Sequence, residues 1–413
     1  MSILSTWLDR YLPIPQVFKP DPPAPVDPAA KPMPRERDPR LDFFRGLAML
    51  IIMIAHTPGN LWTRWIPARW GPSDATEMFV FCSGIAAAIA FGGTFARAGF
   101  WTGTRRILFR CWQIYWAHIG IFVAICFAMA SANEILGPGH KDYISSLALN
   151  PFFQRTEAAL IGFMTLTWVP NYFDILPMYF AILLFTPLII ALKSLDLRLA
   201  ILAMVATYVI ARVMEINLPA SPWSERGWFF NPLCWQLLFF TGFIFGRGWL
   251  KPPPFVWWLL ALAIGYVLVM MCFSNVAMRY FEEVRPFGRW VFERGHKTNF
   301  HLTRYLHILA LAYIALWIFH TRKHWLLMAW AKPIVVTGQQ ALATFMASMV
   351  MGRLAGIALD LLGRENWSFL VVNLTSLSLV IAVAYMVRWY KRMPWRAKQG
   401  GPAQAPAANP ASG

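Results

Sequence analysis

The sequence has few charged residues, and acidic ones in particular. Charged residues make up 14% of the chain and hydrophobic residues 58%, whereas a typical soluble domain is about 25% charged. A chain this apolar would still expose much apolar surface if it folded in water. The composition therefore excludes an ordinary soluble enzyme and the disordered and collagen-like classes. It leaves a polytopic membrane protein made of helices.

Cysteine is also scarce, and several familiar catalytic motifs are missing. The five cysteines lie in apolar runs and none forms a CxxC pair, so we expect neither disulfides nor a metal centre. There is no GxGxxG, no phosphate-binding P-loop and no Gly-x-Ser-x-Gly nucleophile motif. No internal repeat of the transporter kind is evident. Chemistry, if there is any, must come from ionisable residues in or beside the apolar segments.

Those segments are the strongest positive signal in the sequence. Ten of them have roughly the length that crosses a bilayer, so we expect an all-α polytopic bundle of about ten transmembrane helices, the membrane domain covering residues 41–392. Before it, residues 1–40 form a tail with a short amphipathic stretch and a proline-rich linker. After it, residues 393–413 have a disordered composition. The ten segments are 43–57, 74–96, 107–130, 175–192, 198–214, 232–249, 255–273, 301–319, 334–356 and 367–389.

The net charge of +17 indicates an orientation and not a nucleic-acid partner. If the N-terminus is cytoplasmic, the cytoplasmic parts hold 23 basic and 7 acidic residues, and the other side holds 14 basic and 13 acidic residues. Basic residues collect on the cytoplasmic side of membrane proteins. We therefore predict that both termini are cytoplasmic. Many of the 21 tryptophans lie at the ends of apolar runs, as in an interfacial aromatic belt.

The first apolar segment carries two ionisable residues on one face. Arg45 and His56 are eleven residues apart, which is about three turns and roughly 16 Å along a helix. Ionisable groups at such depth are costly and usually functional. The alternative is a snorkelling arginine with a structural histidine.

This spacing resembles the first-helix signature of the membrane acyltransferase-3 superfamily. The stretch from Phe79 to Gly84 is similar to that superfamily's Phe-Phe-x-x-Ser-Gly motif, and the run from Arg105 to Tyr115 is similar to its basic stretch ahead of an aromatic residue. Within the superfamily the chain most resembles the OpgC family. That resemblance rests on the stretches 37–46, 171–179 and 231–242.

The resemblance implies O-acyl transfer in the bacterial inner membrane. The donor would be a cytoplasmic acyl-CoA, with succinyl-CoA favoured, and the acceptor a hydroxyl of an osmoregulated periplasmic glucan. His56 would act as the general base or be acylated transiently. Arg45 would hold the donor, together with a basic cluster whose alternative reading is ordinary positive-inside charge. That cluster is Arg105, Arg106 and Arg110. Membrane lipid is a further partner, we expect no nucleic acid and no metal, and the oligomeric state is open.

Polar residues near the predicted outer face are candidates for binding the acceptor or the acyl group. Asp174 would bind sugar hydroxyls or orient His56, or else cap the fourth span. His301, Arg304 and His307 are spaced three residues apart and would follow one side of a helix. The full set of other candidates is Glu77, Asn171, Tyr179, Lys297, His301, Arg304 and His307. Other functions stay open: O-acetylation of another surface polysaccharide, transport of a glycan or acyl group without chemistry, and a scaffold for glucan synthesis.

Overall fold

The computed structural model describes residues 38–294 and 297–393. Within these residues the chain is all-helical, as predicted, and contains no β-strand. Its long helices are α2 (Pro39–His56), α3 (Ala75–Leu136), α7 (Ile175–Leu195), α8 (Leu197–Val213), α9 (Pro232–Arg247), α10 (Trp257–Cys272), α13 (Leu302–Thr321), α15 (Ala341–Leu362) and α16 (Asn366–Lys391). The features predicted for 1–37 and 394–413 lie outside the described residues.

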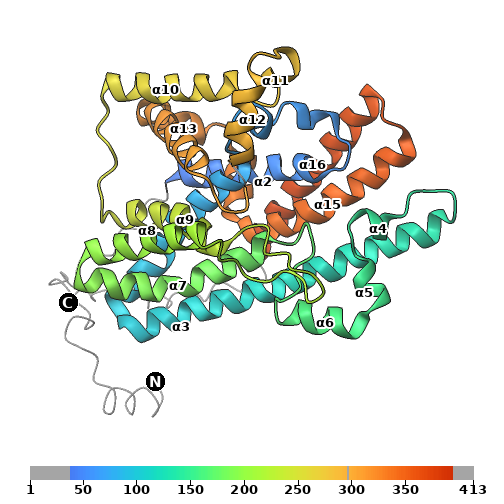
Figure 1. Cartoon of the computed structure of the whole chain (residues 1–413), viewed down its shortest axis with the longest axis horizontal. Helices are drawn as coiled ribbons and strands as arrows, with labels where there is room; N and C mark the ends of the chain where they lie inside the picture. Colours follow the sequence, from blue (N-terminus) through green and yellow to red (C-terminus); the bar gives the residue numbers. More distant parts are fainter. Residues whose placement is uncertain (1–37, 295–296, 394–413) are drawn as a thin grey trace, which may run out of the picture.

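Shorter helices fill the connections between the long ones (Figure 1). The connection between α3 and α7 and the connection between α10 and α13 contain most of them. They are η2 (Leu61–Arg64), η3 (Pro67–Arg69), α4 (Tyr143–Ser146), α5 (Asn150–Gln154), α6 (Thr156–Met164), α11 (Ala277–Tyr280), α12 (Arg285–Arg294), η4 (Lys323–Leu327) and α14 (Lys332–Gln339).

Every segment predicted to span the membrane contains helix. Six helical stretches in the described part are long and apolar enough to cross it: α3, α7, Trp257–Tyr280 (α10 with α11), α13, α15 and α16. The chain is thus a multi-pass membrane protein. Helices α2, α8 and α9 are shorter or carry more charge. The segment predicted at 334–356 is divided, because the chain leaves the helix at Gln340 between α14 and α15. The count of ten spans and the position of the termini stay predictions.

Helix α3 contains two of the predicted spans in one 62-residue element. Its backbone is non-helical at Gly99, with φ 81° and ψ 174°, a conformation that glycine adopts at no steric cost. The chain folds back there, since Arg106 donates a hydrogen bond to Thr94, twelve residues earlier, and the ring of Phe95 lies against Gly103. The two halves form a tight helical hairpin with no loop between them.

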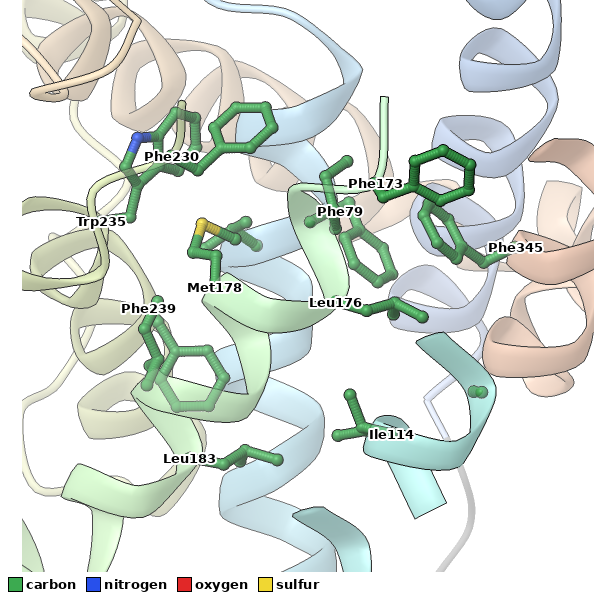
Figure 2. Close-up of a cluster of buried hydrophobic side chains, with 14 of the residues drawn as sticks. Phe79, Ile114, Phe173, Leu176, Met178, Leu183, Phe230, Trp235, Phe239 and Phe345 are labelled. Atoms are coloured by element: carbon green, nitrogen blue, oxygen red, sulfur yellow. The ribbon is translucent and has the colours of Figure 1, made fainter. Parts of the chain in front are cut away.

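The largest cluster of buried apolar side chains joins both halves of α3 to helices from across the chain. Figure 2 shows side chains from α3 (Phe79 and Ile114), α7 (Leu176, Met178 and Leu183) and α9 (Trp235 and Phe239) gathered around the α7 ribbon. The ring of Phe239 lies 5.8 Å from that of Tyr179. Aromatic contacts of this kind add to the packing of a helix bundle. The cluster fixes the positions of α3, α7 and α9 relative to one another.

Glycines allow two helix pairs to approach closely. Gly46 of α2 lies against the backbone of α14, where a Cβ would fall 1.9 Å from the carbonyl oxygen of Ile334, and Gly338 lies equally close to the backbone of α2. Gly84 of α3 and Gly242 of α9 do the same between those two helices. Small residues at helix interfaces are typical of membrane bundles, where close packing drives association. Gly84, the last residue of the motif-like stretch from Phe79 to Gly84, is thus a close-packing residue.

Replacing Gly46 by alanine should destabilise the protein by about 1–3 kcal/mol, because α2 and α14 would be forced apart. The matched control is Gly265→Ala in α10, where a Cβ would meet no atom within 4 Å and alanine is the better helix former. The thermal midpoint of each purified variant in detergent measures the effect. Equal midpoints for Gly46→Ala and the wild type would contradict the close approach.

Candidate active site

His56 is the last residue of α2 and is half-buried. Helix α2 runs unbroken through both Arg45 and His56, so their placement on one face, predicted from the spacing, is confirmed. The imidazole ring of His56 lies 4.7 Å from the ring of Tyr172. The backbone of Gly352 in α15 approaches His56 from another side. The candidate base thus lies where α2, α15 and the segment before α7 meet.

Tyr172 is held firmly beside His56. Its hydroxyl donates a hydrogen bond of 2.5 Å to the backbone oxygen of Met349 in α15. Burial raises the pKa of the Tyr172 phenol to about 12 against the opposing effect of Arg353, so the phenol stays neutral. Its backbone has φ 88°, a conformation that costs free energy for a bulky residue and is common at functional sites.

A network of two acids and two bases joins the start of α3 to α13. Lys297 binds one carboxylate oxygen of Asp74 at 2.6 Å, and Arg304 binds one oxygen of Glu77 at 2.6 Å. The other oxygen of each acid completes the N-terminal cap of α3, where Thr76 donates to Asp74 and the Asp74 backbone donates to Glu77. Glu77 is 0% exposed. Both acids are therefore fully used in holding the helix end and the two cations.

The charge on Asp74 is stabilised by its neighbours. Burial would raise the pKa of this carboxyl, but Lys297 and Arg304 hold it below its ordinary value, so Asp74 is ionised. Asp74, Lys297 and Arg353 are the charged groups within electrostatic range of His56. Of the predicted substrate-binding residues, Lys297 thus lies near the predicted catalytic residue, and Arg304 is linked to it through Asp74.

Residues of α8 and α9 hold the backbone segment that carries Lys297. The indole of Trp235 donates a hydrogen bond of 2.9 Å to the Lys297 backbone oxygen. The Asn231 amide bonds the side chain of Asn299, and Arg212 bonds the Asn299 backbone oxygen at 2.9 Å. The segment between α12 and α13 is therefore anchored to the bundle just where it carries Lys297.

His301 and His307, the two histidines predicted to lie along one side of α13, make different contacts. His301 is the N-cap of α13, where its ring nitrogen accepts a hydrogen bond from the backbone of Thr303. His307 is buried and shares a hydrogen bond of 2.6 Å with the hydroxyl of Ser73. Arg304 and His307 thus both contact the segment that begins α3. His301 precedes the first turn of α13, at the N-cap position.

Asn171 and Asp174 form a separate group with Arg226. The Arg226 guanidinium donates hydrogen bonds to the Asn171 side chain and to the Val169 backbone oxygen. Burial raises the pKa of the Asp174 carboxyl to about 7 against the effect of Arg226, and its Oδ1 atom makes no hydrogen bond. Asp174 occupies the N-cap position of α7 but makes no side-chain cap bond. Its electrostatic partner is Arg226.

Loss of the proton on Asp174 should lower the free energy of unfolding as the pH rises. Its pKa is raised above the ordinary 3.8, so the folded chain binds this proton more tightly than the unfolded chain does. The stabilisation is complete below about pH 4 and is lost by about pH 7, by at most about 4 kcal/mol. The thermal midpoint should therefore fall less between pH 5 and pH 8 in Asp174→Asn than in the wild type. Parallel curves for the two proteins would contradict the assignment.

The predicted donor-binding arginines are spread over the opposite end of the bundle. Arg106 donates to Thr94, Arg110 donates a hydrogen bond of 3.0 Å to Gln113, and Arg105 is exposed. They are near one another along α3 but do not converge on one point. Arg45 and Arg110 lie within electrostatic range of Tyr179. The role of Tyr179 in binding the substrate stays a prediction.

Two residues beside His56 escaped the sequence analysis. Tyr172 lies in a loop, inside the stretch that carried the family resemblance, and Arg353 is a single cation in the apolar α15. The guanidinium carbon of Arg353 lies 3.8 Å from the centre of the Tyr172 ring. An isolated cation within an apolar run was the signal available for Arg353. Its neighbours depend on the packing of α15 against the segment before α7.

An open polar cavity of about 500 Å³ lies beside the anchored segment. It is bounded by the connection between α8 and α9 and by the two residues that follow Lys297. Its lining is Glu215, Asn217, Leu218, Pro219, Ser224, Glu225, Gly227, Thr298 and Asn299. Carboxylates, amides and hydroxyls of this kind can hydrogen-bond a polar ligand.

The fold and the site define a multi-pass helical membrane protein with a histidine at the edge of a buried charge network. The family model for the OpgC protein matches residues 37–392, and the chain belongs to this family. The family associates it with the modification of osmoregulated periplasmic glucans in a transferase role. Comparisons with curated proteins and with solved structures found no match.

Proposed function

We propose that the protein is an O-acyltransferase of the acyltransferase-3 type in the bacterial inner membrane. It would transfer a succinyl group from a cytoplasmic acyl-CoA to hydroxyls of osmoregulated periplasmic glucans. The observation that carries the proposal is the position of His56. Its ring lies against Tyr172 and beside the charge network, on the same helix face as Arg45 at the opposite end. Membership of the OpgC family supports the glucan as acceptor.

The chemistry needs one base and one activated acyl group. The sugar hydroxyl attacks the thioester carbonyl while His56 takes its proton, so that a C–O bond forms. The C–S bond then breaks, and the thiolate of coenzyme A leaves and takes up a proton. The same products arise if His56 first accepts the acyl group and then passes it to the sugar. The charges of Lys297, Arg353 and Asp74 act on the imidazole in either route.

The donor would bind through the arginines of α2 and α3. Arg45 and Arg110 both lie near Tyr179, and guanidinium groups suit phosphate oxygens. Arg45 would hold the donor on the face of α2 that leads to His56, and Arg105 and Arg106 would add charge at the cytoplasmic surface. No metal is needed for this reaction. Acyl-CoA, glucan and membrane lipid are thus the partners that the proposal names.

The acceptor would approach from the predicted periplasmic end. The polar cavity beside Thr298 and Asn299 offers hydrogen-bonding groups next to the segment that carries Lys297. Asn171 and Asp174, grouped with Arg226, would contact other sugar hydroxyls. A glucan is much larger than any one of these features, so several weak contacts are the expected mode of binding.

Mass spectrometry of glucans tests the proposed function. Cells that lack the protein would be complemented with the wild-type chain, and the glucan substituents measured. An added mass of about 100 Da per substituent supports succinyl transfer, since that is the mass of the succinyl group replacing a hydrogen. An added mass of about 42 Da keeps the chemistry and makes the group acetyl. Unchanged substituents would favour a transporter or a scaffold.

A further inference from the structure

Arg353 is a cation without a counter-ion in the described part of the chain. It lies in α15, inside a candidate membrane span, and is half-buried. Its guanidinium carbon lies 3.8 Å from the centre of the Tyr172 ring, and its buried Nε atom makes no hydrogen bond. Lys297 and Arg304, by contrast, are paired with carboxylates. A buried charge is expensive unless it is paired, so the position is poised for an anion.

The anion would lie next to His56. The guanidinium carbon of Arg353 is 3.8 Å from the Tyr172 ring centre, and the His56 ring centre is 4.7 Å from the same point. The two groups are therefore at most 8.5 Å apart. The Arg353 guanidinium lies over the Tyr172 ring and also interacts with its hydroxyl. Its remaining N–H groups suit the two oxygens of a carboxylate.

We propose that Arg353 binds the free carboxylate of a dicarboxylic acyl group during transfer, and so selects succinyl over neutral acyl groups. The inference rests on the proposed function and names the determinant of its acyl specificity. In a succinyl group two methylenes separate the thioester carbonyl carbon from the carboxylate carbon, a distance of about 4 Å. A carboxylate held by Arg353 thus leaves the thioester carbonyl within reach of His56.

A neutral acyl group of the same length would be disfavoured. A butanoyl group fills nearly the same volume as a succinyl group but leaves the Arg353 charge without a partner. Sites built to bind a polar group discriminate strongly against analogues that lack it, because the site's own polar atoms are then left unpaired. The wild-type protein should therefore transfer succinyl at least about 100-fold faster than butanoyl.

The test uses the purified full-length protein in lipid vesicles, with glucan as acceptor and either succinyl-CoA or butanoyl-CoA as donor. Arg353→Gln should lower succinyl transfer at least about 100-fold and change butanoyl transfer by less than about threefold. Arg353→Lys keeps the charge but lacks the forked donors of a guanidinium. Its rate of succinyl transfer should therefore fall between those of the wild type and of Arg353→Gln. The control is Arg285→Gln at the surface, where the arginine pairs with the exposed Glu282; it should leave both rates unchanged.

Three outcomes would overturn the proposal. The first is an equal loss of transfer activity with both donors in Arg353→Gln and in Arg353→Lys, since that would show that Arg353 has a structural role. The second is unchanged succinyl transfer in Arg353→Gln. The third is a wild-type protein that transfers neither group, and this result alone would remove the proposed function as well. The thermal midpoint of each variant identifies loss of folding.

Discussion

Replacing His56 by alanine should remove the acyl substituents from the glucan and leave the protein in the membrane. The imidazole lies at the end of α2 and is half-buried, so its loss leaves no large cavity in the core. A general base contributes about 10²–10⁴-fold to a rate, and a covalent role would make the loss at least as large. Mass spectrometry of glucans from complemented cells measures the result, and immunoblotting of membranes measures the amount of protein.

The control for His56→Ala is His118→Phe. His118 is buried in α3, and its ring stacks on Phe163 at 4.6 Å, so phenylalanine preserves that contact. This variant should keep its glucan substituents. If His56→Ala also kept them, the catalytic assignment would fail, and a transporter or a scaffold would explain the family membership better. An added acyl mass on the peptide that contains His56, after rapid acid quenching, would distinguish the covalent route from general-base catalysis.

Replacing Arg304 by methionine should destabilise the protein by about 3–5 kcal/mol. Arg304 binds Glu77, which is 0% exposed, and removing one partner of a buried ion pair leaves the other charge uncompensated. The double variant Glu77→Gln, Arg304→Met removes both charges, so it should recover much of the loss. Chemical unfolding of the purified protein in mixed micelles gives the free energies.

The control for this pair is the exposed ion pair between Arg285 and Glu282, whose side chains are 39% and 80% exposed. Arg285→Met should change the free energy of unfolding by less than about 1 kcal/mol, because surface pairs contribute little. If Arg304→Met were as stable as Arg285→Met, the charge network would not hold α3 and α13 together. A double variant no better than Arg304→Met alone would show that lost packing, not charge, is responsible.

The sequence was a good guide to the helices because apolar runs of spanning length leave few alternatives in a membrane. The shared face of Arg45 and His56 followed from helix geometry alone, since both residues belong to one helix. The break at Gln340 was not predicted, although Gly338, Gln339 and Gln340 interrupt the apolar run at this point.

The neighbours of the candidate base depend on tertiary packing that periodicity does not encode. Tyr172 reaches the backbone of Met349, 177 residues later in the chain, and this contact brings Arg353 into the site. The arginines near Tyr179, Arg45 and Arg110, were not predicted as its neighbours either. Lys297 and Glu77 were recognised as polar residues near one face, but their ion-pair partners were not predicted.

The reversal at Gly99 bears on how the protein is made. Two antiparallel helices joined without a loop can leave the translocon together and enter the lipid as one unit. Basic residues flank the turn: Arg97, Arg105 and Arg106. Such residues resist translocation across the membrane, so they would keep the turn on the side where the ribosome makes the chain. The outer ends of both helices would then cross the bilayer early. The first half of α3 would present its acidic cap to the periplasm before Lys297 and Arg304 have been synthesised.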